Sequence, residues 1–415
     1  MPDQQLLKTC QKTSSGRILL VVIDGLGGLP HQGPESGGKS ELERANLPNL
    51  DELARHPHTV LGTLYPVARG FVPGSAAGHF GLLGYDPLLR EHHVGRGVLE
   101  ALDLGLSLEP GDVVARLNFA TVVDGTVTDR RAGRIADAAP LAVELNRCLV
   151  VKGAKVEVIA TREYRGVLVL RHIGQPLSAE VTDTDPRDDG NPIQRCFARN
   201  AADPVAQRTA QIINAVSGQA LAILKPFQDS NAILIRGFSS RPALPTLGEL
   251  HGLEALAIAD YPLYRGIGKL LGMSVCDPVQ ELSAKVQQLS TYYDEFTFFF
   301  MHYKKPDVHG EDGEFDKKVR ALEEFDAIVP EIRKIMKGAL DVIAITGDHS
   351  TPSVLKAHSH HPVPLLLFAA QSQGYETAQA FNERECAHGT FGRARGVELM
   401  SSLLAEAGKV TKFDL

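Results

Sequence analysis

The chain has 415 residues, of which 43% are hydrophobic and 22% are charged, a composition typical of a globular protein with a sizeable core. Its net charge of −7 and its pI of about 6.1 argue against the basic face that a nucleic-acid-binding protein needs, and the sequence contains no run of 18 apolar residues that would predict a membrane span. The length suits one large α/β domain with an insertion, or two or three domains.

The cysteines and the N-terminal residues indicate a cytoplasmic protein. Residues 1–16 lack the apolar core of a signal peptide. The five cysteines are scattered, which suits a reducing compartment and shows no zinc-ribbon spacing. They are Cys10, Cys148, Cys196, Cys276 and Cys386.

The first predicted strand covers residues 17–23, RILLVVI, a continuous apolar run that is typical of a strand buried on both faces. Asp24 and Gly25 follow it directly. In open α/β sheets, ligands bind at the carboxyl ends of the strands, so Asp24 is a candidate ligand-binding residue. A helix cap or a turn is the alternative role for a single aspartate at such a position.

The segment GFVPGSAAGHFGLLGYDP, residues 70–87, places Ser75 at the expected start of a helix. A helix N-terminus presents free N–H groups and a partial positive charge, which favour a phosphate. Ser75 is therefore either an ordinary N-cap residue or a nucleophile placed where a phosphate would be held. The spacing alone leaves both roles open.

A β-rich block begins near residue 111. Strands are predicted at residues 113–123 and 126–128, joined by a hairpin turn at Asp124-Gly125, and further strands and a helix at about 205–224 follow. The block also supplies several arginines, whose guanidinium groups match phosphate and carboxylate groups bidentately. We expect most of these arginines to be solvated surface charges.

Two more apolar strands follow, at residues 296–303 and 342–346. Acidic residues and histidines come directly after both, as a carboxylate does after the first strand. Because the loops after parallel strands share one edge of a sheet, we expect two clusters of carboxylates and imidazoles there, a mixture that suits Zn or Mn. Two ions close together stabilise in-line displacement at phosphorus, so the pattern predicts phosphoryl or sulfuryl chemistry with Ser75 as nucleophile.

At this point the motifs resemble a known family, the archaeal-type, cofactor-independent phosphoglycerate mutases of the alkaline phosphatase superfamily. The resemblance covers nearly the whole chain in the right order. The motifs that carry it are Asp24-Gly25, PGSAAGHFGLLGYDP at 73–87, NFATV at 118–122, RRAGRI at 130–135, GEDGEFDKK at 310–318, TGDHSTP at 346–352 and HSHHPVPLLL at 358–367.

The resemblance implies an α/β fold, with an alkaline-phosphatase-like core sheet that has helices on both faces and an inserted, smaller α+β domain. Residues 1–110 and 246–415 would form the metal-binding core, and residues 111–245 the substrate-binding cap. The cap would close over the substrate and exclude water. The implied reaction interconverts 3-phosphoglycerate and 2-phosphoglycerate through a phosphoserine, with no nucleic-acid or membrane partner. The oligomeric state is left open.

The resemblance also implies roles for individual residues. Two divalent ions are expected, Mn or Zn, with Mg or Co as alternatives. One ion would be bound by Asp24, Ser75, Asp348 and His349, and the other by Asp307, His358 and Glu311. Asp129 and Arg131 would act with Ser75 in catalysis. The residues expected to bind the substrate are His79, Arg131, Arg134, Arg236 and Arg265.

Two residues depart from the family pattern. The family usually reads GHDG where this chain reads GEDG, so Glu311 stands in place of a histidine ligand, with His309 and Asp312 as alternatives. The family also usually has aspartate after the nucleophile, where this chain has Ala76. These departures leave two other hypotheses open. One is a metal-dependent phosphatase or phosphotransferase acting on another small phosphorylated metabolite, and the other is a binding or regulatory protein that has lost turnover.

Overall fold

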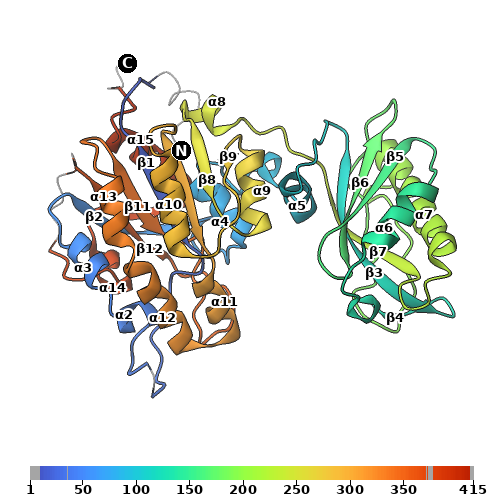
Figure 1. Cartoon of the computed structure of the whole chain (residues 1–415), viewed down its shortest axis with the longest axis horizontal. Coiled ribbons are helices and arrows are strands. Elements are labelled where there is room, and N and C mark those ends of the chain that lie inside the picture. The colour runs from blue at the N-terminus through green and yellow to red at the C-terminus, as the bar shows by residue number, and fades with distance from the viewer. Residues whose placement is uncertain (1–9, 35, 371, 373–376, 412–415) are drawn as a thin grey trace. The chain divides into compact units, whose positions relative to one another are not determined.

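The computed structural model describes the chain except for residues 1–9, 35, 371, 373–376 and 412–415. The chain divides into two compact units (Figure 1). The core unit comprises Met1–His93 and Leu244–Leu415, and the inserted unit comprises Val94–Ala243. Among the described residues, none of the helices combines the length and the apolar character that crossing a bilayer requires.

The core unit is built on an eight-stranded sheet with the order β13-β2-β12-β11-β1-β10-β8-β9. Its central strand, β1, pairs in parallel with β10 and β11, while β12 runs antiparallel to both of its neighbours. The strands are β1 (Ile18–Ile23), β2 (Thr59–Tyr65), β8 (Ala255–Ile258), β9 (Ser274–Val275), β10 (Phe298–Tyr303), β11 (Val342–Thr346), β12 (Val363–Ala369) and β13 (Gly392–Arg395).

Helices cover both faces of this sheet, as the sequence predicted. Leu19 and Val21 point into a hydrophobic core that also contains residues of α10, α12 and α13. On the opposite face, His302 of β10 stacks on Tyr264 of α9. The helices of the core unit are α2 (Glu41–Arg44), α3 (Pro48–Ala54), α4 (Ser75–Leu82), α8 (Leu247–His251), α9 (Pro262–Leu270), α10 (Leu282–Tyr292), α11 (Lys305–Asp312), α12 (Phe315–Asp326), α13 (Val329–Ile335), α14 (Glu383–His388) and α15 (Leu399–Glu406).

The register of the three central strands brings their following loops to one edge. Ile23 of β1 lies opposite Tyr303 of β10, and Val22 lies opposite Thr346 of β11. The residues after all three strands therefore start from the same edge of the sheet, as the sequence predicted for strands that are parallel. All six residues of β1 are buried, which explains its unbroken apolar sequence.

The inserted unit contains five antiparallel strands and three helices. The sheet has the order β4-β3-β6-β5, and β7 also pairs with β3. Helices α6 and α7 cover the face formed by apolar residues such as Leu117 and Ile235. The elements are β3 (Val113–Val123), β4 (Thr126–Asp129), β5 (Ala154–Ala160), β6 (Arg165–His172), β7 (Ala232–Ser239), α5 (Arg96–Asp103), α6 (Ala139–Cys148) and α7 (Pro204–Leu224).

The first boundary between the core unit and the inserted unit lies between His93 and Val94, earlier than residue 110, where the sequence placed it. Residues 94–110 fold with the inserted unit because α5 packs on β3. A Cβ atom at Gly97 would lie 3.3 Å from the backbone of Ala115, and Glu100 pairs with Arg116 at 3.3 Å. The amphipathic pattern of α5 was visible in the sequence, but the sheet that its apolar face covers was not.

Candidate active site

Three residues at the edge of the core sheet form what we call the inner ligand group: Asp24, which follows β1, and Asp348 and His349, which follow β11. All three are fully buried. Nε2 of His349 lies 3.2 Å from Oδ1 of Asp24 and 3.1 Å from Oδ2 of Asp348. The three ligand atoms thus surround one point, as residues that bind a single cation do.

The second oxygen of Asp24, Oδ2, is anchored by three donors. It accepts hydrogen bonds from the Tyr264 hydroxyl, from His302 Nε2 at 3.0 Å and from Lys304 Nζ at 3.0 Å. By contrast, Oδ1 of Asp24 is buried and accepts no well-formed hydrogen bond from any residue that the structure describes, and the same is true of Oδ2 of Asp348. Buried oxygens without donors are costly, and a cation between them would satisfy both.

The charges of this group are strongly coupled. Burial alone would raise the pKa of Asp24, but the hydrogen bond from His302 and the charges of His349 and Lys304 hold it well below its ordinary value. Burial alone would lower the pKa of His349, but the charge of Asp348 and the contacts with Asp24 raise it to about 10. The carboxylates therefore stay ionised in a buried place, as metal ligands must be.

Ser75 lies beside the inner ligand group. It is the first residue of α4, whose N-cap is Gly74, so its hydroxyl is not used as a helix cap. Its Oγ lies 3.3 Å from Nε2 of His349. The helix can approach this closely because Gly78 has no side chain: a Cβ atom there would lie 2.1 Å from the carbonyl oxygen of Asp348. Ser75 is thus placed as a nucleophile would be, beside a cation site and at a helix N-terminus.

Asp307, His349 and His358 form a second cluster, which we call the outer ligand group. Nε2 of His358 lies 3.6 Å from Oδ1 of Asp307. Nδ1 of His358 lies 2.9 Å from the carbonyl oxygen of Pro73, which can only accept a hydrogen bond, so Nδ1 carries the proton and Nε2 keeps its lone pair. The rings of His349 and His358 stack with centroids 3.6 Å apart, so the two groups adjoin each other.

Glu311 lies beside the outer group. It lies on α11 four residues after Asp307, on the same face of the helix. Its Oε1 is 3.3 Å from Nε2 of His358. The two alternatives from the sequence lie less favourably, because Nδ1 of His309 is paired with Glu314 at 2.9 Å and Asp312, exposed like Glu311, forms no ion pair with His358 in the described structure.

The two ligand groups fit divalent ions by their chemistry. The inner group offers carboxylate oxygens, the imidazole of His349 and the nearby Ser75 hydroxyl, and the outer group offers Asp307, His358 and the shared His349, with the Glu311 carboxylate beside them. Such sets of hard oxygens and borderline nitrogens suit Mn and Zn.

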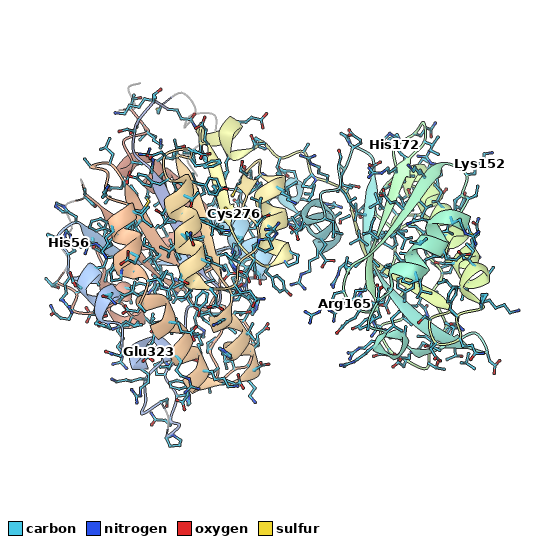
Figure 2. The ribbon with its side chains drawn as sticks, viewed as in Figure 1. His56, Lys152, Arg165, His172, Cys276 and Glu323 are labelled. Atoms are coloured by element: carbon cyan, nitrogen blue, oxygen red, sulfur yellow. The ribbon has the colours of Figure 1, made fainter. Side chains whose placement is uncertain are left out.

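His79 and Arg265 of the core unit were also predicted as site residues, but other contacts hold both side chains. His79 is fully buried, with Nδ1 2.7 Å from the Ser75 carbonyl oxygen and 3.3 Å from Oδ2 of Asp348. It supports the inner group from behind. The Arg265 guanidinium donates to the carbonyl oxygen of Cys276 at 2.5 Å, which ties α9 to the residue after β9. Cys276 is labelled in Figure 2.

A cluster of basic side chains surrounds a buried carboxylate in the inserted unit. Arg130 holds Asp185 with two hydrogen bonds, at 2.9 Å and 2.8 Å. Arg236, which was predicted to bind substrate, approaches the same carboxylate at 3.6 Å, and Arg116 lies opposite Arg236 in the strand register. Burial and the neighbouring Arg116 lower the pKa of Arg236. Two carboxylates, Asp185 and the Glu100 that pairs with Arg116, face these three guanidinium groups, which leaves the cluster suited to an anion.

The other predicted residues of the inserted unit occupy the turn after β4. The carboxylate of Asp129 accepts hydrogen bonds from the backbone N–H groups of Arg131 and Gly133, both at 2.7 Å. The side chains of Arg131 and Arg134 are exposed and form no ion pair with the part of the chain that the structure describes. The structure therefore brings Arg236, but not Arg131 or Arg134, into the cluster around Asp185.

Comparisons with known proteins agree with this geometry. A family model described as 2,3-bisphosphoglycerate-independent phosphoglycerate mutase matches residues 57–228. A protein of Thermus thermophilus, named "probable 2,3-bisphosphoglycerate-independent phosphoglycerate mutase", is 44% identical over 421 residues, which cover 98% of this chain and 98% of that protein. This chain belongs to the 2,3-bisphosphoglycerate-independent phosphoglycerate mutases. A protein of Thermotoga maritima with the same name is 41% identical over 413 residues, which cover 99% of this chain and 98% of that protein.

Solved structures confirm the α/β fold of this mutase. The cofactor-independent phosphoglycerate mutase from Thermoplasma acidophilum is 28% identical and matches with a TM-score of 0.72 over 94% of this chain and 100% of its own. A protein from Pyrococcus horikoshii is 26% identical and matches with a TM-score of 0.79 over 97% of this chain and 100% of its own. The expectation of an isomerase of this family is therefore confirmed.

Several residues of the ligand groups in the core unit, and of the basic cluster in the inserted unit, were missed by the sequence reasoning. Tyr264, Lys304 and Thr351 contact the ligand groups, and Arg130 and Asp185 form the centre of the basic cluster. The positions of Lys304 and Thr351 in the sequence could have revealed them. Each comes after a predicted strand and lies two or three residues from a predicted ligand, His349 or Asp307. Tyr264 is distant in sequence from every ligand, and only the packing of α9 on the sheet reveals its role.

Proposed function

We propose that this mutase interconverts 3-phosphoglycerate and 2-phosphoglycerate through a phosphoserine at Ser75. The observation that carries the proposal is the position of the Ser75 hydroxyl, at a helix N-terminus and 3.3 Å from the imidazole shared by the two ligand groups. The membership of the chain in a family of cofactor-independent mutases supplies the reaction, because without a bisphosphorylated cofactor the phosphoryl group must rest on the enzyme between the two hydroxyls of glycerate.

The reaction consists of two displacements at phosphorus. In the first, Ser75 loses its hydroxyl proton and its Oγ bonds to the phosphorus of 3-phosphoglycerate, while the bond between phosphorus and the C3 oxygen breaks and that oxygen takes up a proton. In the second, the C2 hydroxyl loses its proton and its oxygen bonds to the phosphorus of the phosphoserine, while the bond between phosphorus and Oγ breaks and Ser75 regains its proton. Both steps need an in-line approach, so the glycerate must be reoriented while it remains bound.

Two divalent ions, Mn or Zn, are part of the proposal. Asp24, Ser75, Asp348 and His349 would hold one, and Asp307, Glu311 and His358 the other. Such ions lower the pKa of a bound hydroxyl and neutralise charge on phosphoryl oxygens. The buried oxygens of Asp24 and Asp348 that lack hydrogen-bond donors among the described residues support this part of the proposal.

The inserted unit would bind the glycerate. Arg236, with Arg116 and Arg130 of the cluster around Asp185, is proposed to bind its carboxylate, because guanidinium groups recognise carboxylates bidentately. Asp129 is proposed to carry the proton between the C2 and C3 oxygens, and Arg131 and Arg134 remain further candidates for substrate binding.

The test replaces Ser75 by alanine. Ser75→Ala should lower mutase activity by at least about 1,000-fold, because the nucleophile is lost. Activity is measured with 3-phosphoglycerate and enolase as coupling enzyme, on protein stripped of metal and resupplied with Mn, in the absence of 2,3-bisphosphoglycerate. Mass spectrometry of acid-quenched wild-type enzyme should find phosphate on Ser75.

A matched control is Ser217→Ala in α7, since Ser217 is as buried as Ser75, at 8% exposure each, but lies in the inserted unit. It should keep full activity. Substantial activity of Ser75→Ala would refute the phosphoserine mechanism. Release of inorganic phosphate from other esters, with no isomerisation, would favour the phosphatase hypothesis that the Glu311 and Ala76 departures leave open.

A further inference from the structure

A pocket of about 300 Å³ lies in the core unit, between the loop after β1, helix α2, the residues at the start of β12 and helix α14. None of the described residues that line it belongs to either ligand group. Its wall is mostly apolar and is formed in large part by Leu29, Pro30, Pro362, Pro364 and Ala387. A pocket of this size, with apolar walls and a few polar groups, is typical of sites that bind small organic molecules.

One carboxylate in this pocket forms no ion pair within the described structure. Glu383, the first residue of α14, accepts hydrogen bonds from the N–H of Gly28 at 2.8 Å and from the hydroxyl of Ser40 at 2.7 Å. The neighbouring carboxylate of Glu43, by contrast, is paired with Arg384. Burial raises the pKa of Glu383 to about 7, as expected for a carboxyl group that has no cation beside it.

The remaining charges near the pocket do not balance. Apart from the ion pair just described, two carboxylates, of Glu383 and Glu41, face one ammonium group, that of Lys318, whose charge acts on both. Glu41 is fully buried, and its Oε2 accepts no hydrogen bond from any described residue. This oxygen lies against Gly28 of the pocket wall, where a Cβ atom would come within 2.0 Å of it. One uncompensated negative charge therefore favours a cation in the pocket.

We propose that this pocket is a binding site for a small organic cation, in which a primary ammonium group is attached to an apolar body. The ammonium group would donate to Glu383, because two hydrogen bonds leave this carboxylate with lone pairs for a further donor. The apolar body would lie against Pro30, Pro362 and Pro364. The inference does not depend on the two-ion site, because the pocket shares no described residue with the ligand groups.

An anion or a divalent metal ion fits the pocket less well. Arg384, the one arginine among the described residues of the wall, is already paired with Glu43, so an anion would face Glu383 without compensation. His361 and His388 also line the pocket, but they form no cluster of three metal-ligating side chains with any described residue. A bare ion would also make no use of the apolar walls.

The experiment measures the binding of 4-fluorobenzylammonium to the full-length protein at pH 8 by fluorine NMR. The probe for comparison is 4-fluorobenzyl alcohol, which is neutral and has nearly the same shape. At this pH most of Glu383 is ionised. The cation should bind saturably at one site per chain and at least about 10-fold more tightly than the alcohol, because a hydrogen bond between charged groups contributes more than one to a neutral group.

Three variants locate the bound cation. Glu383→Gln keeps the size of the side chain but not its charge, so it should weaken binding of the cation at least about 10-fold and change binding of the alcohol little. Ala387→Phe should fill the pocket and weaken binding of both probes, and Ala387 is exposed, so the larger side chain is not forced into the core. Glu385→Gln, on the same helix but outside the pocket, is the matched control and should bind as wild type does.

The wild-type curves decide the question even where a variant does not fold, and circular dichroism establishes that each variant does. Absence of saturable binding of the cation to wild type, or equal binding of the cation and the alcohol, overturns the proposal. Binding of the cation that either Glu383→Gln or Ala387→Phe leaves unchanged places it elsewhere and also overturns the proposal. Each of these failures leaves the proposed mutase mechanism standing, since that mechanism uses no described residue of the pocket.

Discussion

The two oxygens of Asp24 have different surroundings. Oδ2 accepts three hydrogen bonds, from Tyr264, His302 and Lys304, whereas Oδ1 accepts none from the described part of the chain and faces His349. Burial lowers the pKa of His302 to about 4, so the ring is neutral at physiological pH and donates its single proton to Asp24. The three donors fix the direction of the free oxygen before any cation binds, which is the role that residues behind a metal ligand have in general.

Tyr264→Phe tests that role. The change removes one of the three donors to Oδ2 of Asp24 but keeps the ring that stacks on His302. Mn²⁺ affinity should fall about 10-fold, because the ligand is less firmly oriented, and activity should return at higher Mn²⁺. The measurement is the Mn²⁺ dependence of mutase activity together with direct Mn²⁺ binding. Tyr261→Phe, an exposed residue just before α9, is the control. An unchanged affinity in Tyr264→Phe would show that the hydroxyl does not orient Asp24.

The residues that gather in the two ligand groups were predicted from the sequence, and the residues that hydrogen-bond to them were not. Asp24, Asp307 and Asp348 each follow a strand that its own apolar run identifies. The partners of Asp24 depend instead on which side chains of β10 and α9 reach the same face, and that depends on register and packing. Arg131 was preferred to Arg130 for a related reason, because neighbouring residues in a turn point in directions that composition does not reveal.

At the scale of elements, buried charged side chains tie the loops of the site to the helices around them. Lys318 of α12 is fully buried and donates to the carbonyl oxygens of Gly27 and Thr351, at 3.1 Å and 2.8 Å. Glu383, the first residue of α14, accepts hydrogen bonds from Gly28 N–H at 2.8 Å and from the Ser40 hydroxyl at 2.7 Å. The loop after β1 is thus held from two helices, by the fully buried Lys318 and by the partly buried Glu383.

Glu383→Gln should change how stability depends on pH. Burial raises the pKa of Glu383 to about 7, although its hydrogen bonds and the charge of Lys318 act in the opposite direction. In the unfolded chain the same group has a pKa of about 4.5. Between these values the folded protein binds the proton more tightly than the unfolded chain, so the free energy of unfolding falls as pH rises, by on the order of 3 kcal/mol in total.

Glutamine cannot ionise, so the variant should lack this fall. Urea denaturation of both proteins at several pH values between 4.5 and 8 measures the difference, which should grow with pH and level off above pH 7. Glu385→Gln on the same helix is the matched control and should follow wild type. Parallel curves for wild type and Glu383→Gln would mean that Glu383 is ionised in the folded protein throughout this range.

Element boundaries show where sequence patterns suffice. The strand predicted at residues 113–123 is the observed β3, because an alternating pattern with a hairpin turn after it defines its own limits. The amphipathic pattern of α5 was equally clear, yet the helix was assigned to the core domain. The apolar face of an amphipathic helix shows that the helix packs on a core, but the sequence does not show which core that is. The predicted boundary at residue 110 therefore lay too late in the chain.

At the scale of the molecule, the two units have separate hydrophobic cores. The core of the inserted unit is built from β3, β6, β7, α6 and α7, which all belong to one continuous stretch of chain. The residues of both ligand groups belong to the core unit. Metal removal should therefore destabilise one unit and leave the other unaffected.

A fragment of residues 94–243 should fold by itself, since its strands pair only among themselves within the described structure. We expect a cooperative thermal transition whose midpoint does not change when EDTA or Mn²⁺ is added. The full chain should show an additional transition that EDTA shifts to lower temperature, because bound ions stabilise the folded core unit by mass action. Calorimetry of both proteins measures this. A fragment without a cooperative transition would show that the inserted unit depends on the core unit for its stability.

The position of β1 in the sheet has a consequence for the order in which a newly made chain can fold. β1 is the central strand, yet both of its neighbours, β10 and β11, come from the far side of the inserted unit in sequence. At 5–20 residues per second, a ribosome needs on the order of 15–60 s to proceed from the end of β1 to the start of β10. The inserted unit can complete its sheet during that interval, whereas the most apolar strand of the protein waits without a partner. Until β10 and β11 are made, β1 has no strand to pair with, and an apolar strand without partners is a site where incomplete chains can associate.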